Sequence, residues 1–216
     1  MIKIKNKITV ALPKGRLFDQ TIDIFSKAGL LNRHISQKTR KLIIESENFR
    51  FLIVRAKDVP TYVQYGVADI GVAGDDVILE QEPEVYIPLN LNIGLCSIAV
   101  AGKPTDKNKY FSNPTYLKIA TKYPKITKKF FSGKGIRVQI IELYGSVELA
   151  PLLGLADFIV DIVETGKTLK ENGLEVIEYI RYSSAKLLVN RISFKTRNKE
   201  IKKIIHNLES YLTKID

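Results

Sequence analysis

Short runs rich in β-branched and apolar residues alternate with segments of helical periodicity along nearly the whole chain. A β-rich run at residues 8–12 is broken by a Pro-Lys-Gly-Arg segment, after which apolar side chains recur at helical spacing up to Gly29. The same reasoning predicts further strands at residues 42–45, 51–55, 69–73, 93–100, 117–121, 137–141, 158–161, 176–182 and 185–189, and further helices from residue 58, from residue 74, and at 125–131, 169–172 and 198–212. Strands that take turns with helices are typical of an α/β fold.

The length of 216 residues allows one large domain or two smaller lobes. Residues 66–72 (GVADIGV) are echoed in kind by residues 154–160 (GLADFIV), each after a short helix-like segment. Two similar α/β lobes would explain this echo. A general preference of helix-to-strand junctions for Gly, Ala and Asp would explain it equally well, so both interpretations stay open.

The charge balance is strongly basic, with 34 Lys and Arg against 23 Asp and Glu and a net charge of +11. Such a chain attracts polyanions, which include nucleic acid, an acidic membrane and phosphorylated small molecules. The basic segment at residues 195–203 has little aromatic interleaving and is more typical of the polar face of a helix than of a nucleic-acid site. The apolar run at residues 8–12 is too short for a signal-peptide core or a membrane span, so we expect a cytoplasmic protein.

Residues that bind transition metals or act as nucleophiles are scarce. Cys96, His34 and His206 are the complete set of cysteines and histidines, and their spacing matches no zinc motif. Ser146 lacks the Gly-x-Ser-x-Gly elbow of a serine hydrolase. We therefore expect no metal site built from the protein alone and no serine nucleophile, and we expect Cys96 to be a small core residue.

The most informative segment runs from Asp161 to Thr168, between a predicted strand and a predicted helix. Its end, Gly166-Lys167-Thr168, resembles a Walker A loop, but that motif requires glycine at position 161, where this chain has aspartate. Backbone N–H groups around Gly166, with the Thr165 and Thr168 hydroxyls, suit the phosphate of a sugar phosphate instead. The Asp161 carboxylate would then accept hydrogen bonds from the ribose hydroxyls. A simple helix cap would use the same residue types, and from the segment alone the two interpretations are equally good.

Three further segments place polar residues at predicted strand ends or helix starts. Lys14 and Arg16 flank Gly15, where backbone can approach a ligand closely and Arg16 could clamp a phosphate, although a solvated basic loop is the more ordinary interpretation. The other two segments offer an arginine, carboxylates and a hydroxyl, and each could consist of helix caps alone: Arg55 with Gly74, Asp75 and Asp76, and Ser146 with Glu148.

Taken together and in order, five segments closely resemble the ATP phosphoribosyltransferase family. They are residues 11–17 (ALPKGRL), 55–63 (RAKDVPTYV), 68–76 (ADIGVAGDD), 145–151 (GSVELAP) and 154–174 (GLADFIVDIVETGKTLKENGL). The match spans nearly the whole chain, and five ordered motifs are far more specific than any one of them.

The resemblance implies a two-lobed α/β fold like the type II periplasmic binding proteins, with mixed sheets and a substrate cleft between the lobes. Residues 1–93 and 184–216 would form the first lobe, and residues 94–183 the second, which carries the phosphate loop. The implied reaction is attack of N1 of the ATP adenine on C1 of the ribose of phosphoribosyl pyrophosphate (PRPP). It releases pyrophosphate, gives phosphoribosyl-ATP, and is the first step of histidine biosynthesis.

The resemblance also implies roles for individual residues. Asp161, Glu148 and Arg16 are the expected catalytic residues, and Mg²⁺ is expected to arrive on the substrate phosphates. The expected PRPP-binding residues are Asp161, Glu164, Thr165, Gly166, Lys167 and Thr168, and the expected residues for ATP or pyrophosphate are Lys14, Gly15, Arg16, Arg55, Gly74, Asp75, Asp76 and Ser146. Many family members have a small residue or serine where Glu164 stands, so its ribose role is the least supported.

The chain ends soon after the last amphipathic segment, which matches the short form of the family. That form depends on a histidyl-tRNA-synthetase-like regulatory subunit, so we expect a hetero-oligomer built on catalytic dimers, without nucleic acid or membrane as a partner. Two other classes of protein are weighed against this interpretation. A non-enzymatic solute-binding protein would share the lobed fold but would normally be exported, and a basic nucleic-acid-binding module would explain the charge but not the Thr-Gly-x-Thr loop.

Overall fold

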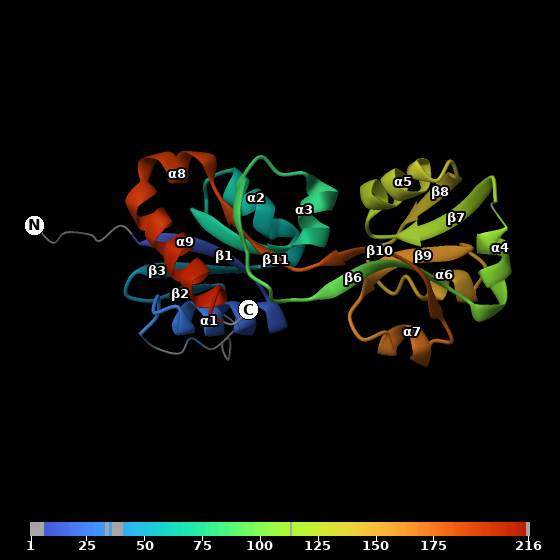
Figure 1. Ribbon diagram of the computed structural model, residues 1–216, viewed down its shortest axis with the longest axis horizontal. Coiled ribbons are helices and arrows are strands. Elements are labelled where there is room, and N and C mark those ends of the chain that lie inside the picture. Colours follow the sequence, from blue (N-terminus) through green and yellow to red (C-terminus); the bar gives the residue numbers. More distant parts are fainter. Residues whose placement is uncertain (1–6, 33–34, 36–40, 113, 215–216) are drawn as a thin grey trace, which may run out of the picture. The chain divides into compact units, whose positions relative to one another are not determined.

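Strands of the described residues form two separate sheets, each covered by helices (Figure 1). The computed structural model describes residues 7–32, 35, 41–112 and 114–214. The chain divides into one unit made of residues 1–94 and 184–216 and a second made of residues 95–183. The division after residue 94 lies one residue beyond the boundary expected from the sequence. The α/β class predicted from the alternating pattern is confirmed.

The first unit contains a six-stranded sheet in the order β2-β3-β1-β4-β11-β5. Strands β3, β1 and β4 are parallel, whereas β2, β11 and β5 run antiparallel to their neighbours. The strands are β1 (Ile8–Pro13), β2 (Ile43–Glu45), β3 (Phe49–Val54), β4 (Ile70–Gly74), β5 (Tyr86–Asn90) and β11 (Ala185–Val189). The helices are α1 (Arg16–Lys27), α2 (Val59–Gln64), α3 (Asp75–Gln81), α8 (Arg191–Thr196) and α9 (Asn198–Leu212), with a 3-10 turn at Ala56–Asp58.

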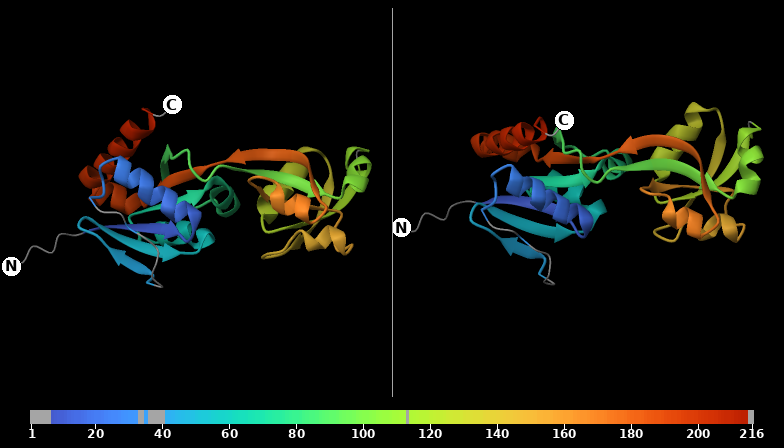
Figure 2. Two further views of the ribbon diagram at one scale, coloured as in Figure 1. Left: turned by 90° about the horizontal axis from the view of Figure 1, so that it is seen from below. Right: turned by 60° about the horizontal axis from the view of Figure 1, so that its bottom comes forward.

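Helices pack against both faces of this sheet (Figures 1 and 2). Val10 and Leu12 of β1 lie in the hydrophobic cluster formed with α1 and α9, whereas Ala11 between them lies in the cluster formed with α2 and α3. Both faces of β1 are therefore buried, which is why this strand is apolar at successive positions instead of alternating with polar ones.

Close packing on the α2 face depends on one glycine. A Cβ added at Gly71 of β4 would lie 2.6 Å from Val63 Cγ2, 2.9 Å from Val59 Cγ1 and 3.2 Å from the carbonyl oxygen of Ala11. No larger side chain fits without moving α2 away from the sheet.

The second unit contains a five-stranded sheet in the order β10-β6-β9-β7-β8. Strand β7 is parallel to β8 and β9, and β6 is antiparallel to β9 and β10. The strands are β6 (Cys96–Gly102), β7 (Tyr116–Thr121), β8 (Arg137–Glu142), β9 (Phe158–Val163) and β10 (Glu175–Ser183). The helices are α4 (Lys107–Phe111), α5 (Pro124–Gly133), α6 (Leu149–Leu152) and α7 (Lys167–Glu171), with a 3-10 turn at Pro104–Asp106.

The sequence echo corresponds to a shared structural unit. The Asp69 side chain accepts a hydrogen bond from the Thr9 amide at 2.8 Å, and the Asp69 amide donates one to the Thr9 carbonyl at 2.9 Å. Asp157 makes the same reciprocal pair with Lys118, at 2.7 Å and 2.8 Å. In each unit this pair locks the start of one parallel strand to its neighbour, so the two segments are alike in structure as well as in sequence.

Several elements differ from the sequence predictions. The strand expected from residue 93 begins only at Cys96, because Asn92 and Gly94 have positive φ angles of 52° and 62° that interrupt an extended chain. Cys96, expected in the core, is half-buried at the start of that strand. The helix expected at 169–172 begins at Lys167, and the strand expected at 158–161 extends to Val163.

Three short elements were not predicted: β5, α4 and α8. Helix α4 lies in a segment rich in Lys and Asn and is anchored by one buried side chain, Tyr110, which leaves no helical periodicity to detect. Helix α8 is fixed by its cap, since the Asn190 side chain accepts bonds from the amides of Ile192 and Ser193. Asp58 precedes α2 as expected, but its side chain makes no capping bond.

His206 is exposed on α9, and the position of His34 lies outside the described residues. None of the helices in the described part of the chain is both long enough and apolar enough to cross a membrane.

Candidate functional site

The predicted phosphate loop connects β9 to α7. Gly166, at φ 71°, is in the left-handed region and makes the sharp turn into the helix without strain. Thr165 Oγ1 accepts a long bond of 3.4 Å from the Lys167 amide, and the N-terminal position of α7 has no side-chain cap. The side chains of Thr165, Lys167 and Thr168 are exposed, so the hydroxyls and the cation face solvent together with the start of α7.

Asp161 lies within β9, just before this loop, and its carboxylate has two partners on one oxygen. Asp161 Oδ1 accepts the Ile162 amide at 2.7 Å and lies 3.0 Å from Lys122 Nζ. The side chain is 13% exposed. Burial raises the pKa of Asp161 above its ordinary value, Lys122 opposes that rise, and the negative charge of Glu148 adds to it.

Lys122 was not predicted as a site residue. It directly follows β7, the parallel neighbour of β9, so its side chain starts from the same sheet edge as the phosphate loop. Thr121 fixes this turn by donating a buried bond of 2.7 Å to the Val160 carbonyl of β9. Adjacent parallel strands end at the same edge of a sheet, so a residue directly after one strand lies near the loop after the next. That rule could have indicated Lys122, but only if the strand order had been known.

The segment before α6 is less regular than a simple helix cap. Ser146 has a φ of 47°, an uncommon conformation for a residue other than glycine, and its side chain is exposed. Glu148 occupies the position before α6 and makes no capping bond there. The interpretation of these two residues as caps is therefore not supported, and the backbone conformation of Ser146 is one that accumulates at ligand sites.

In the first unit, predicted residues follow three adjacent parallel strands. Lys14, Gly15 and Arg16 follow β1, Arg55 follows β3, and Gly74 ends β4. Because these strands are parallel neighbours, all of these residues lie at the carboxyl edge of the sheet, where ligands of open α/β sheets bind. Gly15, at φ 84°, has open space where a Cβ would be, and Lys14, Arg16 and Arg55 are exposed.

The two aspartates that follow β4 differ from each other. The Asp75 amide donates to the Ser184 carbonyl at 3.0 Å, and its carboxylate lies 3.8 Å from Lys186 Nζ. Asp76 is buried, and its Oδ1 folds back over Gly74, where a Cβ would lie only 2.2 Å away. Asp76 therefore fits a structural role in its own turn, and Asp75 remains beside a cation at the sheet edge.

Each unit thus gathers its own set of predicted residues at strand ends. The first holds Lys14, Gly15, Arg16, Arg55, Gly74, Asp75 and Asp76, and the second holds Ser146, Glu148, Asp161, Glu164, Thr165, Gly166, Lys167 and Thr168. Within the described ranges no three His, Cys, Asp or Glu side chains are grouped closely enough to hold a metal ion.

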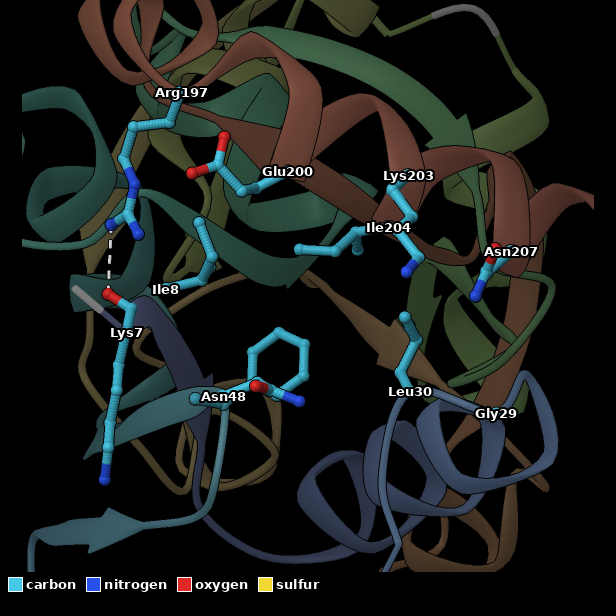
Figure 3. A pocket seen from close by; sticks show the side chains of 11 residues that line it. Lys7, Ile8, Gly29, Leu30, Asn48, Arg197, Glu200, Lys203, Ile204 and Asn207 are labelled. Atoms are coloured by element: carbon cyan, nitrogen blue, oxygen red, sulfur yellow. Dashed lines mark hydrogen bonds between the residues drawn. The ribbon is translucent and has the colours of Figure 1, made fainter. Parts of the chain in front are cut away.

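A cavity of about 460 Å³ in the first unit contains none of the predicted residues (Figure 3). Lys7 and Ile8 lie at the start of β1 and Asn48 precedes β3, so this cavity is at the amino edge of the sheet, opposite the predicted residues. Arg197 in its wall is bonded to the Lys7 carbonyl and to Asp69, which ties it to the fold.

Two α/β units, each built on a mixed sheet, have the fold of the periplasmic-binding-protein type. The periplasmic aliphatic sulphonate binding protein SsuA of Escherichia coli superposes with a TM-score of 0.64 at 11% identity, covering 95% of this chain and 72% of that one. That likeness concerns the fold alone.

The family follows from closer matches. A family profile described as HisG: ATP phosphoribosyltransferase matches residues 55–210. ATP phosphoribosyltransferase of Aquifex aeolicus is 52% identical over 93% of both chains, and ATP phosphoribosyltransferase 2 of Geobacter sulfurreducens is 47% identical over 95% of this chain and 98% of its own length. The ATP phosphoribosyl transferase (HisG:HisZ) complex of Thermotoga maritima superposes with a TM-score of 0.78 at 35% identity over 95% of this chain and 98% of that one. The chain belongs to the ATP phosphoribosyltransferase family.

Proposed function

We propose that this chain transfers the phosphoribosyl group of PRPP to N1 of ATP, which releases pyrophosphate and begins histidine biosynthesis. The observation that carries the proposal is the near full-length similarity to enzymes of this name, at 52% identity over 93% of the chain. The Thr-Gly-Lys-Thr turn beside the carboxylate of Asp161 supplies groups that suit the sugar phosphate.

The second unit is proposed to bind PRPP. The Thr165 and Thr168 hydroxyls, the Lys167 ammonium and the backbone around Gly166 would bind its 5-phosphate, since hydroxyls, cations and N–H groups are the donors that phosphates accept. The Asp161 carboxylate would accept hydrogen bonds from the ribose hydroxyls. Glu164 is exposed at the end of β9 and would lie near the ribose as well.

The first unit is proposed to bind ATP and the pyrophosphate group. Lys14, Arg16 and Arg55 supply cations at one sheet edge, where charge-assisted bonds to phosphate contribute about 1.5–3 kcal/mol each. Gly15 lets the backbone approach the ligand, and Gly74, Asp75 and Asp76 would line the same edge. Ser146 of the second unit is assigned to ATP or pyrophosphate through the family motif.

The chemistry requires no protein nucleophile. Glycosyl transfer passes through a state with positive charge on the ribose ring, so positioning and nearby negative charge lower its energy. Asp161 and Glu148 would supply this negative charge in the second unit, where the charge of Glu148 is one cause of the raised pKa of Asp161. Arg16 would balance charge on the departing pyrophosphate.

Magnesium is proposed to come with the substrates. Mg²⁺ usually keeps several waters and binds through substrate phosphates with only one or two carboxylates. It would supply charge neutralisation on the phosphate oxygens.

A regulatory partner is also part of the proposal. The Thermotoga maritima relative is a HisG:HisZ complex, and this chain covers 98% of the matched chain. We infer that the present chain also assembles with a histidyl-tRNA-synthetase-like subunit, as a hetero-oligomer built on catalytic dimers. A reaction that consumes ATP and a phosphorylated sugar is expected in the cytoplasm.

The test is turnover with and without such a partner. ATP, PRPP, Mg²⁺ and pyrophosphatase are mixed with the chain, and formation of phosphoribosyl-ATP is followed by ultraviolet absorbance. Product that depends on the partner supports both the reaction and the assembly, and product from the chain alone removes the obligatory partner. Folded protein that binds ATP or PRPP but makes no product in either mixture would favour a solute-binding protein.

A further inference from the structure

Lys122 is the cation nearest to the central carboxylate of the second unit, and no motif assigns it a role. Its Nζ lies 3.0 Å from Asp161 Oδ1, with the two side chains 34% and 13% exposed. An ion pair this well shielded interacts more strongly than a pair at the open surface.

The pairing is directed at a single oxygen of the carboxylate. Oδ1 accepts from the Ile162 amide and pairs with the Lys122 ammonium, whereas Oδ2 makes no hydrogen bond or ion pair with the described part of the chain. A carboxylate held through one oxygen has a fixed plane and presents its other oxygen to an incoming hydroxyl.

The turn that carries Lys122 is itself fixed by a hydroxyl network. Thr121 donates to the Val160 carbonyl at 2.7 Å and accepts the Tyr123 amide at 2.9 Å. Thr127 of α5 donates to the Tyr123 carbonyl at 2.7 Å. All three side chains are buried, so Lys122 starts from a backbone position that is set relative to β9.

The charged surroundings of Asp161 come from two neighbouring segments. Lys122 approaches from the turn after β7, and Glu148 acts from the segment before α6. On the other side, the residue opposite Asp161 in β6 is Ala99, which carries no charge. Lys122 is therefore the nearby cation that offsets both burial and the repulsion from Glu148.

We propose that Lys122 is a positioning residue for the transfer reaction, which holds Asp161 ionised and oriented so that its second oxygen receives the ribose hydroxyls of PRPP. The proposal rests on the proposed function above. It assigns Lys122 no contact with the substrate.

The test compares Lys122→Met, Lys122→Gln and Lys122→Arg, with Lys129→Met as a control that removes the same charge from an exposed site on α5. Each variant is assayed with the regulatory partner, and kcat/KM for PRPP is measured against pH. Loss of the cation should raise the pKa of Asp161 further, so the acidic limb should move up by about 1 pH unit in the Met and Gln variants. The Arg variant should restore the limb, and the control should match the unsubstituted chain.

A second readout does not depend on turnover. Titration of the Asp161 side-chain carbon by ¹³C NMR, with Asp161→Asn used to assign the signal, should show the same upward shift in Lys122→Met. If the unsubstituted chain makes product but neither the limb nor the NMR titration moves in that variant, the positioning role is wrong while the function stands. Lower turnover with an unmoved limb would equally overturn it. Absence of product from the unsubstituted chain would refute the function, and the NMR titration would still decide the role of Lys122.

Discussion

Asp69 and Asp157 occupy equivalent places in the two sheets, and the side chain of each accepts a backbone amide from near the start of the parallel neighbour strand, that of Thr9 in β1 and that of Lys118 in β7. Their surroundings differ. Asp69 also binds Ser193 Oγ at 2.7 Å and Arg197 Nη1 at 2.8 Å, in a group that is mostly buried. Asp157 has instead a bond from Lys109, which is half exposed.

The two aspartates should therefore differ in their contribution to stability. Asp69→Asn leaves Arg197 mostly buried without its anion, so it should cost about 3 kcal/mol in the free energy of unfolding. Asp157→Asn keeps the backbone bond and loses only a solvent-screened pair, for about 1 kcal/mol or less. Urea unfolding of both variants measures the difference, and equal losses would contradict the account of the two environments.

The ionised Asp161 should destabilise the fold that contains it. Its folded pKa is raised, chiefly by burial, so the folded state binds the proton more tightly than the unfolded state. Stability of the unsubstituted chain should therefore fall, relative to Asp161→Asn, as pH rises through the window between the unfolded and folded pKa values. Thermal unfolding from pH 4 to pH 8 measures this difference, and Asp161→Asn should have a higher Tm than the unsubstituted chain at pH 8. In a separate kinetic assay, the same variant should use PRPP less well. The prediction would be contradicted if the stability of Asp161→Asn, measured relative to the unsubstituted chain, were lower at pH 8 than at pH 4.

Gly71 should be intolerant of even one methyl group. Gly71→Ala would force contact with Val63 and Val59, and overpacking of this kind typically costs about 1–3 kcal/mol. Gly133→Ala in α5 is the matched control, since a Cβ there meets nothing within 4 Å and alanine favours the helix. Denaturant midpoints should move in opposite directions for the two variants, and tolerance of alanine at position 71 would mean that α2 is less closely packed.

Arg16 and Lys27 are exposed cations at opposite ends of α1. Comparing substitutions at these two positions distinguishes binding of phosphate by Arg16 from a general effect of positive charge. Arg16→Ala should lower kcat/KM by about tenfold or more, as expected for the loss of one charge-assisted bond to phosphate. Lys27→Ala removes the same charge near Asp23 and should leave the kinetics unchanged. Equal effects in the two variants would indicate a general electrostatic contribution.

Thr165 tests the phosphate loop. Thr165→Ala should raise KM for PRPP more than KM for ATP, because the hydroxyl is proposed to bind the 5-phosphate. Thr105→Ala, an exposed threonine of the same unit, is the control. An unchanged KM for PRPP in Thr165→Ala would remove this residue from the proposed site.

Much of the fold could be predicted from the sequence because its strands are short, apolar and separated by clear breaks. The predictions were wrong where tertiary contacts decide, as in α4, which depends on one buried tyrosine, and in the loop before β6, where Asn92 adopts a left-handed conformation. Asn90 and its neighbours in β5 are largely exposed, so that edge strand has no apolar alternation to detect.

In the candidate site, too, some residues are indicated by sequence motifs and others only by the three-dimensional arrangement. Motif residues such as Thr165 and Arg16 were proposed from the sequence because their types and order follow a known pattern, and their roles stay predictions. Lys122 was not among them, because its place beside Asp161 depends on β7 and β9 being parallel neighbours, which no local pattern shows. The packing of Asp76 over Gly74 is likewise a three-dimensional contact that no sequence pattern indicates.

The most direct test of the central claim is identification of the bond that forms. PRPP labelled with ¹³C at C1 is incubated with ATP, Mg²⁺, the chain and its regulatory partner, and the products are examined by NMR. The account predicts a new linkage between labelled C1 and N1 of the adenine, with one pyrophosphate released for each product molecule, and its loss in Asp161→Asn. Labelled PRPP that stays intact with folded protein, or that is hydrolysed without joining ATP, would contradict it.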